Sequence, residues 1–187
     1  MSQVVIFASG SGTNAEAIIR YFMGSSVCIQ AVFCNNPDAG VIARAEELNV
    51  PVHLFDKSQL KEGVVLQQLK AYQPDLIVLA GFLWLFPHSI LEFFPKVVNI
   101  HPALLPKYGG KGMYGNRVHE AVLNAKEAHT GITIHYVNEQ YDEGAIIAQF
   151  ETSIADCTTV ACVAAKVHAL EQEHFPKVIE QLLTTNS

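Results

Sequence analysis

The chain has 187 residues, of which 50% are hydrophobic and 16% are charged, and this composition excludes an intrinsically disordered protein. Its length fits one domain, so we expect residues 1–187 to fold as a single unit. Lys and Arg number 12 against 18 Asp and Glu, and this acidic excess argues against a nucleic-acid partner.

No apolar run reaches the roughly 18 residues of a membrane span, and no basic segment precedes the first apolar run as in a signal peptide. We therefore expect a cytoplasmic protein that acts on small molecules and does not bind a membrane. The cysteines form no Cys-x-x-Cys pair, which favours small apolar core residues in a reducing compartment and no metal site. They are Cys28, Cys34, Cys157 and Cys162.

The N-terminal region predicts a phosphate-binding turn, because an apolar strand, a Gly- and Ser-rich segment at 9–14 and a helix follow one another. Glycines let an anion approach the backbone, and the first amide groups of a helix attract it. The pattern Gly10-x-Gly12 also fits a dinucleotide fingerprint, but the next strand ends in Asn35-Asn36, where such a site needs an acidic residue. A phosphate monoester is therefore favoured, and a tight turn without a ligand is the alternative.

Helices and strands alternate through the middle of the chain. In order, we predict a helix at 41–48, a strand at 51–55, a helix from an N-cap near 56–58 to Tyr72, a strand at 75–81 and a short helix at 87–94. The strand at 75–81 is continuously apolar, as expected for a central parallel strand that is covered on both faces. The apolar segment 82–86 after it is either core or the wall of a pocket for a flat aromatic molecule.

The strand predicted at 97–101 carries two polar side chains on one face, because Asn99 and His101 are two residues apart. Pro102 cannot donate to a sheet ladder, so His101 stands at the carboxyl end of the strand. Ligands bind at that end of open α/β sheets. An amide and an imidazole are therefore predicted to face a ligand together.

The C-terminal half completes the sheet. Residues 106–115 are rich in Gly and Pro and indicate a mobile lid, and beyond them we predict a helix at 116–124, antiparallel strands at 131–137 and 145–151, and a helix at 158–183. The fold class is α/β: a mostly parallel, Rossmann-like open sheet of about seven strands with helices on both faces and an antiparallel edge near the C-terminus.

The polar residues favour direct attack of an amine on an acyl carbon, since no Ser or Cys lies in an elbow motif beside His101. Asn99 and a protonated His101 would donate to the developing oxyanion, which is worth roughly 2.7–4 kcal/mol for one donor. Asp142, in the turn between the last two strands, would keep His101 protonated. If His101 is instead structural, the chain is a non-catalytic module that binds a phosphometabolite.

Four blocks now carry a specific resemblance that covers nearly the whole chain. The chain resembles the phosphoribosylglycinamide formyltransferases, a family of folate-dependent transferases of purine biosynthesis. The blocks are the loop 9–14, Leu79-Ala80-Gly81-Phe82, Asn99-Ile100-His101-Pro102 with its extension to Tyr108, and the run from Gly131 through His135-Tyr136-Val137 to Asp142-x-Gly144.

The resemblance implies transfer of a formyl group from 10-formyltetrahydrofolate, a co-substrate, to the amine of 5-phosphoribosylglycinamide, with no metal. It implies His101 as proton donor, Asp142 as the carboxylate that raises its pKa, and Asn99 at the formyl group. Substrate contacts are implied for Gly12, Thr13, Asn14 and Glu173, and a folate pocket for Leu83, Trp84, Leu85, Phe86 and Asn99.

The chain departs from the family pattern at Trp84, where many members carry Arg, and the loop 110–115 is longer than in some relatives. The basic contact to the folate tail is expected from either Lys57 or Lys61. Methionyl-tRNA formyltransferase would need an RNA-binding domain and a basic face, and formyltetrahydrofolate deformylase a regulatory domain. Hydrolysis of 10-formyltetrahydrofolate is the alternative enzymatic hypothesis. Either a monomer or a homodimer is expected.

Overall fold

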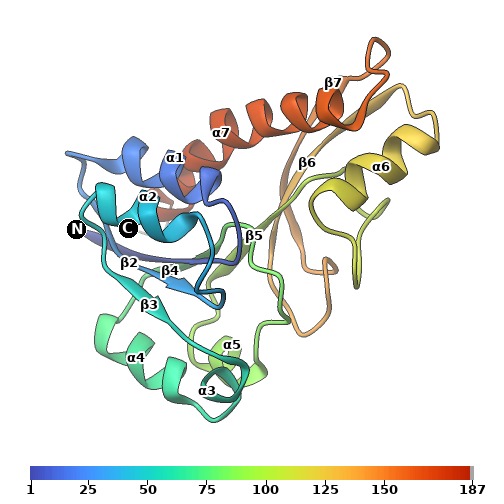
Figure 1. Ribbon diagram of the computed structural model, residues 1–187. Helices are drawn as coiled ribbons and strands as arrows, with labels where there is room; N and C mark the ends of the chain where they lie inside the picture. Colours follow the sequence, from blue (N-terminus) through green and yellow to red (C-terminus); the bar gives the residue numbers. More distant parts are fainter. Residues whose placement is uncertain (186–187) are drawn as a thin grey trace.

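The protein, seen here in a computed structural model that describes residues 1–185, is built on one sheet with helices on both faces (Figure 1). The seven strands lie in the order β3-β2-β1-β4-β5-β6-β7. Neighbouring strands from β3 to β5 are parallel, whereas β6 runs antiparallel to both β5 and β7. The predicted fold class, with its antiparallel C-terminal edge, is confirmed.

Most predicted elements are found within a few residues of their expected limits. The strands are β1 Ser2–Ala8, β2 Val27–Cys34, β3 Val52–Leu54, β4 Leu76–Leu79, β5 Val97–His101, β6 His129–Tyr136 and β7 Ile146–Ser153. The helices are α1 Thr13–Phe22, α2 Val41–Glu47, α3 Lys57–Lys61, α4 Val64–Tyr72, α5 His88–Phe93, α6 Asn116–Asn124 and α7 Val160–Thr184.

One predicted helix is divided in two. Asp56 caps α3 as expected, in a capping box with Gln59. Gly63 then adopts a left-handed conformation with φ of 87°, which interrupts the helical hydrogen bonds before α4 begins. The single helix predicted from residue 56 to Tyr72 is therefore α3 followed by α4.

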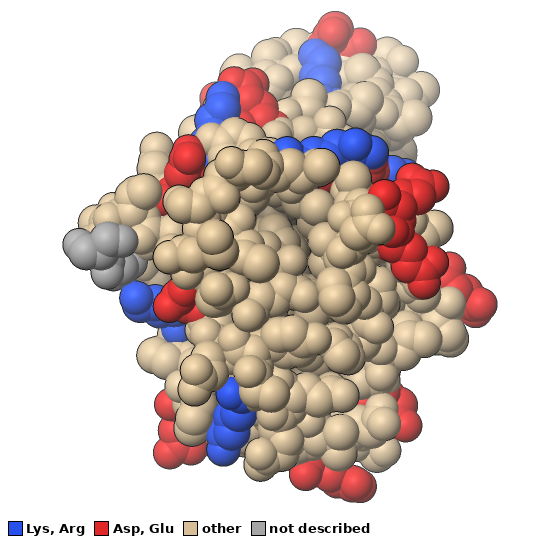
Figure 2. Space-filling model, turned by 90° about the vertical axis from the view of Figure 1, so that its left-hand side faces the viewer, with Lys and Arg blue, Asp and Glu red and all other residues tan. Residues whose placement is uncertain are grey.

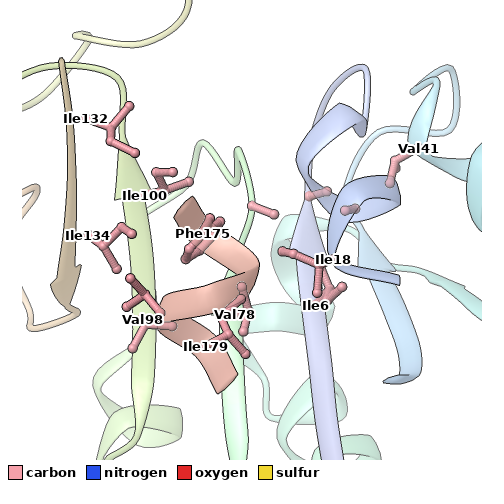
Figure 3. Close-up of a cluster of buried hydrophobic side chains, with 14 of the residues drawn as sticks. Ile6, Ile18, Val41, Val78, Val98, Ile100, Ile132, Ile134, Phe175 and Ile179 are labelled. Carbon is pink, nitrogen blue, oxygen red and sulfur yellow. The ribbon is translucent and has the colours of Figure 1, made fainter. Parts of the chain in front are cut away.

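The sheet separates two hydrophobic layers, because successive apolar residues of a strand point to opposite faces. In β1, Ile6 packs on the side of α1 and α7, and Phe7 packs on the side of α3, α4 and α5. Both side chains are fully buried, as the continuous apolar pattern predicts. Figure 3 shows the layer that includes Ile6, Ile18, Val41, Val78, Val98, Ile100, Ile132, Ile134, Phe175 and Ile179.

The cysteines depart from the expectation in one respect. Cys34 is a buried free thiol, as predicted for a core residue, but Cys157 and Cys162 form a disulfide. The turn into α7 brings their Cα atoms to 5.4 Å, within the range that a disulfide spans. A search for Cys-x-x-Cys pairs misses this pairing, since the two residues are five positions apart.

Charged side chains are dispersed on the face of the molecule in Figure 2, where Lys and Arg lie in small groups among Asp and Glu. In the part of that face that the structure describes, they form no continuous basic surface. No helix within residues 1–185 is both long and apolar enough to cross a membrane.

Candidate active site

A cavity of about 520 Å³ opens at the carboxyl ends of β1, β4 and β5, where the topology predicts a ligand site. Its lining combines the turn after β1, the apolar segment after β4, the end of β5, the glycine-rich loop 110–115, the turn 137–142 and parts of α6 and α7. The turn after β1, the apolar segment after β4 and the end of β5 each gave a functional signal of their own in the sequence. The fold brings them to one cavity.

His101, at the end of β5, contacts two groups that decide where its protons lie. Its Nε2 atom is 2.8 Å from the carbonyl oxygen of Tyr108, which can only accept, so Nε2 carries a hydrogen and donates. Its Nδ1 atom is 3.4 Å from Oδ2 of Asp142. The proton that His101 gains or loses is therefore the one on Nδ1, beside the carboxylate.

Burial dominates the protonation of this imidazole. The side chain of His101 is 4% exposed, and burial lowers its pKa below 6.5 although Asp142 and the Tyr108 carbonyl raise it. Asp142 acts in the predicted direction, but in the free protein burial outweighs its effect on the pKa of His101. Asp142 reduces the cost of charging a ring that burial keeps neutral.

Asp142 is held by contacts from three segments. The backbone N–H of Gly110 donates to Oδ2 at 2.9 Å, and Nε2 of His135 is 3.7 Å from Oδ1. Burial by itself would raise the pKa of Asp142, but His135, His101 and Gly110 together lower it below 3.8. The carboxylate is thus ionised at neutral pH.

The glycine of the Asp142-x-Gly144 sequence is required for a steric reason. A Cβ atom at Gly144 would lie 1.6 Å from the carbonyl oxygen of Tyr136, so only glycine lets the turn pass this close to β6. That same carbonyl accepts a hydrogen bond from Nδ1 of His135 at 2.9 Å. Gly144 therefore supports both the position of the Asp142 turn and the orientation of His135.

Asn99 is oriented by the neighbouring strand, because the antiparallel register of β5 and β6 pairs it with His135. Nδ1 of His135 donates to the carbonyl oxygen of Tyr136, and Nε2 is the ring nitrogen that faces Asn99. Asn99 Nδ2 lies 3.1 Å from that nitrogen and donates to it. One amide hydrogen of Asn99 is thereby used to fix the side chain, and the other remains for a ligand.

In the glycine turn after β1, some residues line the cavity and others serve packing. Thr13 and Asn14 line the cavity, at the start of α1, where no side chain caps the helix. Gly12 does not line it: a Cβ atom there would lie 2.5 Å from Cα of Val41, and its φ is 81°. Gly12 is required by the contact between α1 and α2, and its contact with the phosphate stays a prediction.

The apolar segment after β4 is partly core and partly cavity wall, so both readings of it hold. Phe86 is buried in the layer of α3 to α5, whereas Leu83 and Leu85 are exposed by 42% and 43%. All four predicted residues of this wall, including Trp84, line the cavity. Nζ of Lys57 is 5.8 Å from the centre of the Trp84 ring, so of the two candidate lysines Lys57 is the one seen at the wall.

The predicted acidic residue of α7 is displaced by two positions. Glu173 has a side chain that is 60% exposed, it pairs with Lys177, and it does not line the cavity. Glu171 lines the cavity, is 7% exposed and accepts from Nδ1 of His168 at 2.9 Å. Glu171 therefore replaces Glu173 as the candidate ligand of the acceptor.

The periodicity of apolar residues in α7 could have identified Glu171 as a residue of the buried helix face. Val163, Val167 and Phe175 are fully buried and repeat every four residues, and Glu171 completes the series on the same helix face. His135, His119 and His168 were also not assigned to the site from the sequence. His135 and His119 act through neighbours that are distant in the chain, whereas His168 binds Glu171 three residues further along α7. Among residues 1–185, no group of three or more His, Cys, Asp or Glu side chains is placed to hold a metal ion.

In this doubly wound sheet, an Asn-x-His strand end faces an Asp-x-Gly turn, an arrangement that suits transfer of an acyl group. The profile of the formyl transferase family matches residues 2–179, so the chain is a member of this family, whose co-substrate is a formyltetrahydrofolate. The resemblance found in the sequence is confirmed.

Within the family, the similar proteins share one name. The phosphoribosylglycinamide formyltransferase of Bacillus subtilis is 35% identical over 100% of this chain and 97% of its own length. That of Escherichia coli is 30% identical over 94% of this chain and 84% of its own length. The chloroplastic enzyme of Arabidopsis thaliana is 38% identical over 92% of this chain, which spans 61% of that relative.

Solved structures agree with this grouping. The crystal structure of the phosphoribosylglycinamide formyltransferase from Bacillus halodurans superimposes with a TM-score of 0.89 at 36% identity, and covers 100% of this chain and 97% of that one.

Proposed function

We propose that residues 1–187 act as one formyltransferase domain that transfers the formyl group of 10-formyltetrahydrofolate to the amine of 5-phosphoribosylglycinamide. The products are formylglycinamide ribonucleotide and tetrahydrofolate, a step of de novo purine biosynthesis. The observation that carries the proposal is the meeting of His101 and Asp142, 3.4 Å apart, in a cavity with a helix N-terminus and an apolar wall. Near-full-length similarity to the B. subtilis enzyme supports it.

The acceptor binds along the polar side of the cavity. Thr13, Asn14 and the uncapped amide groups of α1 bind its phosphate, since such groups favour an anion. Glu171 binds the sugar hydroxyls, because a carboxylate is a strong acceptor for O–H groups. These contacts place the amine of the acceptor towards His101.

The formyl donor binds along the apolar side. Leu83, Trp84, Leu85 and Phe86 offer apolar surface and backbone groups to its flat ring system. The remaining N–H of Asn99 reaches the formyl oxygen. Lys57, beside Trp84, is a basic residue that can pair with the acidic tail of the folate.

The reaction proceeds by direct attack of the amine nitrogen of the acceptor on the formyl carbon. A C–N bond forms to the acceptor, and after the tetrahedral stage the bond from the formyl carbon to the folate nitrogen breaks. Asn99 and protonated His101 donate to the oxygen that becomes negative. The proton that the amine loses moves to Nδ1 of His101, and Asp142 stabilises the imidazolium that this forms. The proton then passes to the departing folate nitrogen as its bond to the formyl carbon breaks.

A spectroscopic assay tests this function. Tetrahydrofolate should form from 10-formyltetrahydrofolate at a rate that depends on 5-phosphoribosylglycinamide, with one formylated acceptor per turnover. Equal turnover without the acceptor would instead identify a hydrolase.

Substitution of the central histidine separates an enzyme from a binding module. In His101→Ala, formyl transfer should fall by roughly 10²- to 10⁴-fold, the range of general acid–base catalysis, because a proton donor is lost. Binding of the acceptor, measured by calorimetry, should persist. A variant as active as the parent would show that His101 is structural.

A further inference from the structure

One buried side chain of the cavity has no structural explanation. His119 lies on α6, lines the cavity and is 2% exposed, and its Nδ1 atom is buried without a hydrogen-bond partner in the structure. The other buried residues of this short helix, Val118 and Val122, are apolar. An unpaired buried nitrogen destabilises the folded protein, so an apolar side chain would serve packing better at this position.

His119 lies near the His168–Glu171 pair and shares a cavity with the His101–Asp142 pair. The α6 helix packs against α7, and the ring of His119 is 6.3 Å from that of His168, which binds Glu171. His119 and His101 line the same cavity, and the charge of His101 affects the pKa of His119. His119 thus lies beside the His168–Glu171 pair, in the cavity that holds the reaction centre.

The protonation of His119 follows from these neighbours. Burial lowers its pKa below 6.5, and the imidazoles of His168 and His101 lower it further, although Glu171 opposes them. The ring is therefore neutral at neutral pH. A neutral imidazole presents one N–H donor and one acceptor nitrogen, which suits an uncharged partner that also has one of each.

We propose that His119 is a specificity-determining residue that hydrogen-bonds the amide group of the acceptor substrate. The inference rests on the proposed function, in which the amine of the acceptor lies at His101 and its sugar hydroxyls lie at Glu171. The amide joins these two parts of the molecule, so it lies between them, in the cavity that His119 lines. Either its N–H or its carbonyl oxygen can supply the hydrogen bond that Nδ1 of His119 lacks.

Two substitutions at His119 test the proposal, because the first should lower activity without lowering stability and the second should restore activity. In His119→Phe, kcat/KM for the acceptor should fall about tenfold, the usual effect of one lost hydrogen bond, while KM for 10-formyltetrahydrofolate is unchanged. The Tm of the free protein should stay or rise, because an unpaired polar group is removed, and the added acceptor should raise Tm less than in the parent. His119→Gln should recover much of kcat/KM, since its amide also has a donor and an acceptor.

An acceptor that lacks the two ring hydroxyls of its sugar identifies which group His119 contacts. With this analogue, the ratio of kcat/KM between the parent and His119→Phe should remain about tenfold, as expected for independent contacts. A ratio near one would assign His119 to the sugar and overturn the proposal. So would unchanged kcat/KM in His119→Phe, or a large fall of Tm in both variants, which would make the ring a structural residue.

Failure of the proposed function would look different. In that case the parent chain itself would transfer no formyl group to 5-phosphoribosylglycinamide. If the parent is active but the His119 variants give one of the contrary outcomes above, the inference on His119 is wrong and the proposed function still stands.

Discussion

Two histidine–carboxylate pairs in the same cavity have opposite effects on their imidazoles. His101 is 4% exposed and 3.4 Å from Asp142, and its pKa is lowered. His168 is 53% exposed and 2.9 Å from Glu171, and its pKa is raised, chiefly by that hydrogen bond. A nearby carboxylate therefore does not decide the charge of a histidine. Burial outweighs it at His101, and the short hydrogen bond outweighs burial at His168.

The difference suits the two pairs to different tasks. At His101 the ring is neutral at rest and becomes charged only with help from Asp142, as a group that exchanges a proton during a reaction requires. At His168 the ring is more readily charged and holds Glu171 in place, as a group that orients a ligand requires. We therefore expect removal of the first carboxylate to affect turnover, and removal of the second to affect binding.

Removal of the first carboxylate should have the largest effect. In Asp142→Asn, which preserves size, kcat should fall roughly 10²- to 10⁴-fold because the imidazolium loses its counter-charge. The pKa of His101, followed by NMR titration, should fall further below its ordinary value, since burial is then less opposed. Activity within about threefold of the parent would contradict the role of Asp142 in proton transfer.

Removal of the second carboxylate should give an intermediate effect on binding. In Glu171→Gln, KM for the acceptor should rise about tenfold with little change in kcat, because one strong acceptor of hydroxyl groups is weakened. The pKa of His168 should fall towards 6.5 as its charged partner disappears.

Glu173→Gln is the matched control, since it makes the same chemical change two residues away on the same helix. Its side chain is 60% exposed and does not line the cavity, so steady-state kinetics should match the parent. A larger effect at Glu173 than at Glu171 would restore the assignment suggested by the sequence.

The smallest effect is expected in the pH dependence of stability. Folding lowers the pKa of His101, so the folded state is penalised as pH falls from about 6.5 towards the lower folded value. Folding raises the pKa of His168, so its stabilisation is complete below about 6.5 and is lost as pH rises through the folded value. Acidification from about pH 8 to 5 therefore destabilises through the first group and stabilises through the second.

Urea unfolding over this range checks the two signs. In His101→Gln, the loss of unfolding free energy on acidification should be smaller than in the parent. In His168→Gln it should be larger. Parallel pH profiles for all three proteins would contradict both pKa directions.

Much of the fold could be predicted because its signals are local. The continuous apolar runs of β1 and β4 and the limits of α6 follow from periodicity and from residues that end strands and helices. The break at Gly63 was missed because a glycine within a helical pattern interrupts it only when its neighbours require another direction. The pairing of Cys157 with Cys162 was missed because it depends on the turn before α7.

The site could be predicted in part, for the same reason. Asn99, His101 and Thr13 stand at the ends of elements, so strand direction alone brings them to the cavity. His135 acts on Asn99 only through the register of β5 and β6, which no local pattern discloses. Whether the carboxylate of α7 is at 171 or 173 depends on which helix face is buried.

The sequence by itself determined the order of strands and helices, the polar residues at the end of β5 and the turn that carries Asp142, because these follow from patterns within a few residues. The tertiary structure alone decided that His101 is neutral at rest, that Glu171 faces the cavity and that His119 has an unpaired nitrogen beside it. Those properties depend on burial and on contacts between residues far apart in the chain, and burial is a property of the folded assembly of elements.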